Sequence, residues 1–151
     1  MTNRKIVVEN RKARHEYELY DRYEAGLELK GTEIKSIRLG KVQLRDSYIS
    51  IRNGQAFIKG MHISPYEFGN RFNHEEDRER RLLLHKNEIL KLDQATRIKG
   101  YTVVPVSLYL SKGLAKMQIA LAKGKNLHDK REANKARDAK REIQKALKNR
   151  Y

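Results

Sequence analysis

A division near residue 123 most limits what this chain can fold into. Residues 123–151 hold 11 Lys and Arg against 4 Asp and Glu. Their only large aliphatic residues are Leu127, Ile143 and Leu147. Such a segment buries too little apolar surface to offset the conformational entropy that ordering would remove. We therefore predict a folded body over residues 1–122 and a basic C-terminal tail over residues 123–151.

The tail has only a weak helical pattern. Ala136, Ala139, Ile143 and Leu147 recur three or four residues apart, which is the spacing of one narrow helix face. An isolated helix of about 20 residues is marginal in water. We predict a tail that is disordered when free and helical when it binds an anionic surface, with a bend at Gly124.

The body has the pattern of a mainly β domain with short helices. We expect strands within residues 15–29, 42–44, 48–51, 56–63, 101–110 and 114–121, with hairpin turns at Asn53-Gly54 and Lys112-Gly113. Helices are expected over residues 32–40, with Thr32 as the N-cap, and from residue 82 through residue 92 to an end before Gly100. This order favours an oligonucleotide-binding (OB)-type Greek-key barrel, with a generic α+β fold as the alternative.

Charge favours an anionic partner. The formal net charge is +15, so nucleic acid is the first expectation and an acidic membrane surface the second. The chain has no cysteine and no apolar run near the ~20 residues of a membrane span. The first residues lack the apolar stretch of a secretory signal. We expect a soluble cytoplasmic protein that does not act at a membrane.

Motifs for catalysis are missing. The five histidines are dispersed, and no His-Glu-x-x-His pair, phosphate-binding loop or dinucleotide fingerprint occurs. We predict no enzyme, no cofactor and no metal. A ribonuclease that uses His15 and His85 stays open as a less favoured alternative.

Five strings of residues point to one family. They are GTEIKSIR at 31–38, ISPYE at 63–67, RRLLLHKNEI at 80–89, KGYTVVP at 99–105 and AKGKNLHDKRE at 122–132. In this order and spacing they closely resemble the SsrA-binding (SmpB) protein family, from about residue 10 to the end of the chain. The departures are small: Arg81 stands where the family often has lysine, and Glu79 where proline is common.

The resemblance implies a part in bacterial ribosome rescue by trans-translation. In that family an OB-type barrel binds the tRNA-like domain of transfer-messenger RNA (tmRNA). The complex, with alanyl-tmRNA and elongation factor Tu, enters the A site of a stalled ribosome, where the protein replaces the missing anticodon arm. The tail crosses the decoding centre into the empty mRNA channel and folds there as a helix. The nascent peptide is then tagged for degradation, and the protein itself does no bond chemistry.

The resemblance also implies two sets of site residues. The tmRNA-binding set is Asn10, Arg14, His15, Glu33, Lys35, Lys86 and Lys116. The set for the ribosomal decoding centre and mRNA channel, both formed with small-subunit rRNA, is Lys123, Gly124, Lys125, His128, Asp129, Lys130, Arg131, Lys135 and Arg141. Cations suit phosphates, whereas polar and planar groups suit unstacked bases.

Plainer interpretations exist for several of these residues. Glu33 could be a carboxylate in the first turn of a helix, and Lys35 a solvated charge. Arg78, Arg80 and Arg81 fit a cationic loop as readily as an RNA contact. For the whole chain, the alternative function is a structural ribosomal or architectural RNA-binding protein whose body and tail both bind rRNA permanently.

Overall fold

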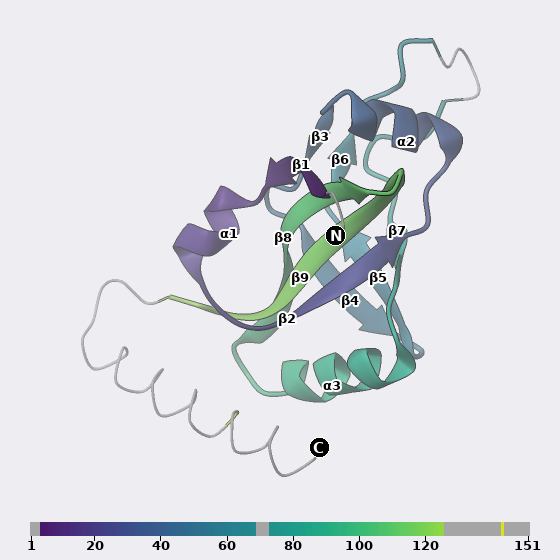
Figure 1. The fold of residues 1–151 in the computed structure, drawn as a ribbon. Coiled ribbons are helices and arrows are strands. Elements are labelled where there is room, and N and C mark those ends of the chain that lie inside the picture. The colour runs from purple at the N-terminus through teal and green to yellow at the C-terminus, as the bar shows by residue number, and fades with distance from the viewer. Residues whose placement is uncertain (1–3, 69–72, 126–142, 144–151) are drawn as a thin grey trace.

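A computed structural model describes residues 4–68, 73–125 and 143 of the chain (Figure 1). The strands in these residues are β1 (Arg4–Glu9), β2 (Tyr17–Leu27), β3 (Val42–Gln43), β4 (Tyr48–Arg52), β5 (Gln55–Lys59), β6 (His62–Ile63), β7 (Arg80–Leu83), β8 (Tyr101–Ser111) and β9 (Leu114–Gly124). The helices are α1 (Arg11–Glu16), α2 (Gly31–Arg38) and α3 (Lys86–Thr96). The expectation of a mainly β fold with short helices is confirmed. None of the described helices is long and apolar enough to cross a membrane.

The longer strands form one antiparallel sheet whose two sides meet. The order is β1-β8-β4-β5-β7-β2-β9, and β9 also pairs with β8. Six strands therefore follow one another in a ring, and β1 extends it beside β8, where Arg4 pairs with Ser111. The short strands β3 and β6 pair separately, with Val42 opposite Ile63.

Both predicted hairpin turns are present. Asn53 and Gly54 have φ angles of 53° and 71°, between β4 and β5. Lys112 and Gly113 have φ angles of 51° and 78°, between β8 and β9. Two successive positive φ values match the right-handed twist of the flanking strands, which is why Asn-Gly marks such turns.

The helix predicted over residues 82–92 is wrong in its first part. The segment from Arg80 to Leu83 is strand β7, and its residues alternate between buried and exposed. The helix begins only at Lys86, after His85, whose backbone N–H donates a hydrogen bond to Glu88 Oε1 at 3.0 Å. A run of consecutive leucines fits both the helical period of 3.6 residues and the strand period of two residues. Pairing with β5 and β2 makes this segment a strand.

The core lies inside the ring of strands and under two helices. Ile37 of α2 and Leu92 of α3 pack into one cluster with strand residues such as Ile58 and Ile119. Figure 1 shows α2 and α3 at opposite ends of the strands, so each helix covers one end. Met61 and Met117 have no exposed surface and belong to the same cluster.

The body extends slightly beyond the predicted boundary at residue 122. Strand β9 continues through Gly124, which pairs with Tyr17 of β2, and the Lys125 N–H donates to the Glu16 carbonyl at 2.7 Å. Ile143, predicted to belong to a separate tail, is buried and packs with the body's core cluster. Residues 126–142 and 144–151 lie outside the described residues.

Candidate nucleic-acid interface

Asn10, the first residue predicted to bind RNA, is a buried helix cap. Its side-chain oxygen accepts from the Ala13 N–H at 3.2 Å, which satisfies one of the free donors at the start of α1. Its side-chain nitrogen donates to the Pro105 carbonyl at 2.9 Å, and its backbone N–H to Val106 at 2.8 Å. Asn10 therefore attaches α1 to β8.

The outer side of α1 carries exposed cations. Arg14 and His15 are both exposed in the last turn of the helix. Arg14 also lines a groove of about 500 Å³ with Tyr17, Arg22 and Lys125. The Lys125 ammonium donates to the Arg14 carbonyl at 3.4 Å, which places a cation at the negative end of α1. Arg14 belongs to the predicted tmRNA-binding set and Lys125 to the predicted ribosome-binding set, so the fold brings one residue of each set into this groove. Arg22 is the third cation that lines it.

Glu33 points into the protein rather than towards solvent. It lies in the first turn of α2, where its Oε1 accepts from the Lys30 backbone N–H at 2.8 Å. The same oxygen accepts from Arg78 at 2.5 Å, and Oε2 accepts from Arg80 Nε at 2.5 Å. Glu33 has no exposed surface, so it reaches no RNA in this conformation.

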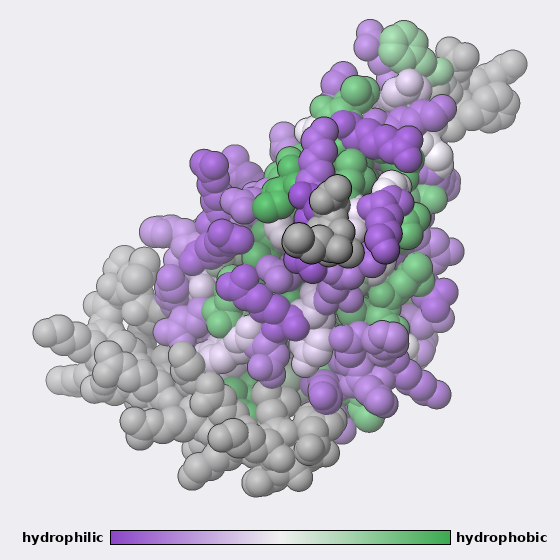
Figure 2. Space-filling model, viewed as in Figure 1, coloured by the Kyte–Doolittle hydropathy of each residue, from purple (hydrophilic) through white to green (hydrophobic). Residues whose placement is uncertain are grey.

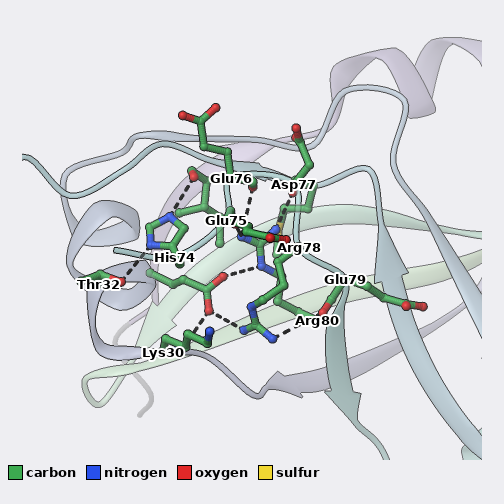
Figure 3. Close-up of polar contacts among 12 residues, drawn as sticks. Lys30, Thr32, His74, Glu75, Glu76, Asp77, Arg78, Glu79 and Arg80 are labelled. Atoms are coloured by element: carbon green, nitrogen blue, oxygen red, sulfur yellow. Dashed lines mark hydrogen bonds and ion pairs between the residues drawn. The ribbon is translucent and has the colours of Figure 1, made fainter. Parts of the chain in front are cut away.

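Arg80 is equally enclosed. Its remaining guanidinium nitrogens donate to the carbonyls of Met61 at 2.6 Å, Glu76 at 3.1 Å and Glu75 at 3.2 Å (Figure 3). One arginine therefore joins α2, β7 and the segment before β7. Burial acts to raise the pKa of Glu33, but hydrogen bonds from Arg78, the Lys30 N–H and Arg80 outweigh it and lower that pKa.

Two further side chains attach the segment before β7 to α2. His74 Nε2 donates to the Ile63 carbonyl at 2.9 Å, and its Nδ1 lies 2.9 Å from the Thr32 hydroxyl (Figure 3). The expectation that Thr32 is the N-cap of α2 is wrong, because Lys30 holds that position and the Thr32 hydroxyl is bound to His74. His74 therefore joins α2, which carries the exposed residues, to β6.

Lys35 is one of those exposed residues. It lies on α2, two residues after Glu33, and its ammonium is 5.3 Å from the centre of the Tyr66 ring. This is the distance of a cation–π contact, which leaves the charge accessible to a phosphate. Sequence reasoning selected Lys35 but missed Tyr66 as its neighbour.

Lys116 has a different environment. Its ammonium lies 3.0 Å from Glu24 Oε1, and the other oxygen of Glu24 accepts from the Tyr109 hydroxyl and from Arg4 at 3.1 Å. The hydrogen bonds from Tyr109 and Lys116 lower the pKa of Glu24. The positive charge of Lys116 is therefore partly neutralised, unlike that of Lys86, which is exposed at the start of α3.

The second predicted set is described only at its beginning. Lys123 is partly buried on β9, with its ammonium 5.3 Å from the Tyr101 ring, and Gly124 and Lys125 are exposed. The other predicted ribosome-contacting residues lie outside the described residues: His128, Asp129, Lys130, Arg131, Lys135 and Arg141.

The described residues include no group of three or more His, Asp or Glu side chains placed to hold a metal ion. His15, at the end of α1, and His85, just before α3, are both exposed and lie on separate elements. The exposed side chains of α1 and α2 include the cations Arg14 and Lys35 and the imidazole of His15, with the Tyr66 ring beside Lys35. Figure 2 shows a mainly hydrophilic face with scattered hydrophobic patches. This surface is suited to a folded polyanion.

Comparisons with known proteins agree with this surface chemistry. A family model described as SmpB protein matches residues 7–149. A relative from Carboxydothermus hydrogenoformans, named SsrA-binding protein, is 58% identical over 147 residues, covering 97% of this chain and 99% of the relative. Another of that name, from Staphylococcus haemolyticus, is 54% identical over 145 residues, covering 96% and 93%.

A solved structure is similar as well. It is described as "tmRNA-SmpB: a journey to the center of the bacterial ribosome" and superposes with a TM-score of 0.68 at 44% sequence identity. The similarity covers 82% of this chain and 87% of that one.

Proposed function

The chain belongs to the SmpB protein family, and on this premise we propose that it binds tmRNA and acts in the rescue of stalled ribosomes by trans-translation. The observation that carries the proposal is the similarity to SsrA-binding proteins over nearly the full length of both chains. The family is one of RNA-binding proteins, and we infer that this member contributes shape and charge rather than bond chemistry.

The body is the proposed tmRNA-binding part. We infer that its six-stranded ring is a barrel of the OB type, whose exposed surfaces bind nucleic acid in many proteins. Arg14 on α1, Lys35 on α2 and Lys86 on α3 are the proposed phosphate contacts, because all three are exposed cations of the predicted set. Asn10 and Glu33 act indirectly in this proposal, because each holds the helix that carries one of those cations.

The proposed role of residues 123–151 is to sense the empty mRNA channel. Their excess of positive charge suits a passage lined by rRNA phosphates. Residues 129–151 would span about 35 Å as a helix, since each residue adds about 1.5 Å. The cytoplasm, where ribosomes stall, is the proposed location.

A reconstituted translation reaction tests the proposal. Ribosomes are stalled on a message without a stop codon and supplied with alanyl-tmRNA, elongation factor Tu and this protein. We expect addition of the tmRNA-encoded tag to the nascent peptide only when the protein is present. Tagging at the same rate without it would contradict the proposed function. Cleavage of the RNA by the purified protein would instead favour the ribonuclease alternative.

A further inference from the structure

Two aromatic rings project beside α2 without a place in the core. Tyr66 and Phe68, which we name the aromatic platform, lie in the segment between β6 and β7, which extends beyond α2 in Figure 1. Their ring centres are 5.6 Å apart and meet edge to face at 68°. Phe68 is 73% exposed, the largest exposed fraction among the large hydrophobic side chains described. Figure 2 shows hydrophobic surface at the far end of this projection.

The platform is held firmly at its base. Asn73 accepts from the Tyr66 N–H at 3.0 Å and donates to the Tyr66 carbonyl at 2.5 Å, so one side chain fixes both backbone groups. Its oxygen also accepts from the His74 N–H at 3.2 Å, and His74 is bound in turn to Thr32 and Ile63. These bonds fix the backbone at Tyr66, so this residue needs little further ordering on binding, which favours affinity.

One cation contacts the platform, and two more are exposed at the end of α2 and just after it. The first is Lys35, whose ammonium is 5.3 Å from the Tyr66 ring, and the other two are Arg38 and Lys41. The backbone of Lys41 accepts from the Ser64 N–H at 3.0 Å, so this stretch is adjacent to the start of the projecting segment. A purely apolar partner would have to desolvate these charges, whereas RNA offers a flat base next to phosphates.

We propose that the aromatic platform stacks on an unstacked base of folded RNA while Lys35 contacts an adjacent phosphate. The inference rests on the proposed function and deepens it, because it adds a base-stacking site to the cationic surface. Bases in loops and bulges are free to leave their own stack, and any base presents a π face to an aromatic ring. Two RNAs could supply that base, the tRNA-like domain of tmRNA or the rRNA of the stalled ribosome.

Binding measurements with Phe68 variants of the full-length protein test the platform. Dissociation constants are measured for a tRNA-like tmRNA fragment and, separately, for stalled ribosomes. Because stacking on an aromatic ring contributes about 1–3 kcal/mol, F68A and F68L should each weaken binding to one of these RNAs about 5- to 150-fold. The RNA that is affected identifies the source of the base. F68W, which keeps an aromatic face, should bind nearly as the unchanged protein does.

The salt dependence separates stacking from charge. F68A should leave the slope of log affinity against log salt unchanged, whereas K35Q should reduce it, because only the lysine releases counterions. The matched control is L90A, on α3 at the other end of the strands, where Leu90 is 51% exposed. It should bind both RNAs normally.

Three results would contradict the proposal that the aromatic platform stacks on an RNA base. In the first, F68A binds both RNAs within about twofold of the unchanged protein, below the effect of one stacked base. In the second, F68L binds normally while F68A does not, which would indicate apolar packing that needs no aromatic ring. In the third, L90A loses as much affinity as F68A. An unchanged protein that binds neither RNA would contradict the proposed function itself.

Discussion

Arg80 Nε lies 2.5 Å from Glu33 Oε2, and neither side chain has exposed surface. The pair joins α2 to β7 inside the protein. Because Glu33 is enclosed, we propose that it acts on RNA binding only through the residues it holds in place, Lys35 on the same helix and Arg78 beside it.

Removing the charge of Glu33 should therefore lower stability. A buried ion left without its partner costs about 3–5 kcal/mol, and E33Q leaves Arg80 in that state while also removing the carboxylate partner of the partly exposed Arg78. We expect the free energy of unfolding, measured by urea denaturation at pH 7, to fall by about that amount. The matched control is E28Q, because Glu28 is exposed and 3.9 Å from Arg81, and it should change stability by less than about 1 kcal/mol. A variant E33Q as stable as the unchanged protein would contradict the structural role.

Acid should weaken the fold through the same carboxylate. The pKa of Glu33 in the folded protein is below its ordinary value of 4.5, since hydrogen bonds from Arg78, Lys30 and Arg80 outweigh the effect of burial. Its stabilisation is thus complete above about pH 4.5 and is lost as the pH falls through the lower folded value. Glu24 is shifted in the same direction by Tyr109 and Lys116.

Urea unfolding between pH 7 and pH 3 measures this loss. The free energy of unfolding should be nearly level at the upper end and fall steeply below about pH 4.5. In E33Q the decline should be shallower, because glutamine does not titrate. An equally steep decline in that variant would assign the acid sensitivity to other carboxylates.

Lys35 and Lys116 should differ in their contributions to RNA binding. Lys35 is exposed beside an aromatic ring, whereas Lys116 forms an ion pair with Glu24 at 3.0 Å. K35Q should weaken binding to the tmRNA fragment and reduce the salt slope by about 0.7–0.9 for one lost phosphate contact. K116Q should have a smaller effect, because Glu24 already offsets its charge. Titrations at several salt concentrations decide this, and a larger loss for K116Q would misplace the proposed face.

Deleting residues 129–151 should separate the two proposed parts of the protein. The truncated chain should keep most of its affinity for tmRNA and lose tagging on stalled ribosomes. Ile143 is 1% exposed against the core, so the truncation also removes a core contact. I143A in the full chain is the control, since it removes that contact and keeps every tail charge. Loss of tmRNA binding in the truncated chain, but not in I143A, would contradict the two-part proposal.

Local signals in the sequence predicted much of the fold. The Asn53-Gly54 and Lys112-Gly113 turns need a backbone that few residue types adopt. The apolar residues of β8 and the alternating apolar residues of β9 are typical of strands with a buried face. By contrast, β1 and α1 carry mostly polar residues and form through pairing with β8 and capping by Asn10. Such tertiary partners leave no periodicity in the sequence.

The candidate site was harder to predict for a similar reason. Lys35 and Arg14 are predicted binding residues and are exposed. Glu33 and Asn10 are buried, and their sequence pattern is the same whether they face RNA or the interior. Arg80 can be buried because the carbonyls of Met61, Glu75 and Glu76 accept its hydrogen bonds. No spacing of residues along the chain predicts this arrangement. The platform of Tyr66 and Phe68 likewise depends on Asn73.

Sequencing the RNA that co-purifies with the affinity-tagged protein from its own cells tests the central claim most directly. At moderate salt, where the phosphate contacts of the protein persist, tmRNA should dominate the recovered RNA. Recovery of rRNA in amounts equal to the protein, without enrichment of tmRNA, would contradict the claim and favour a permanent ribosomal component.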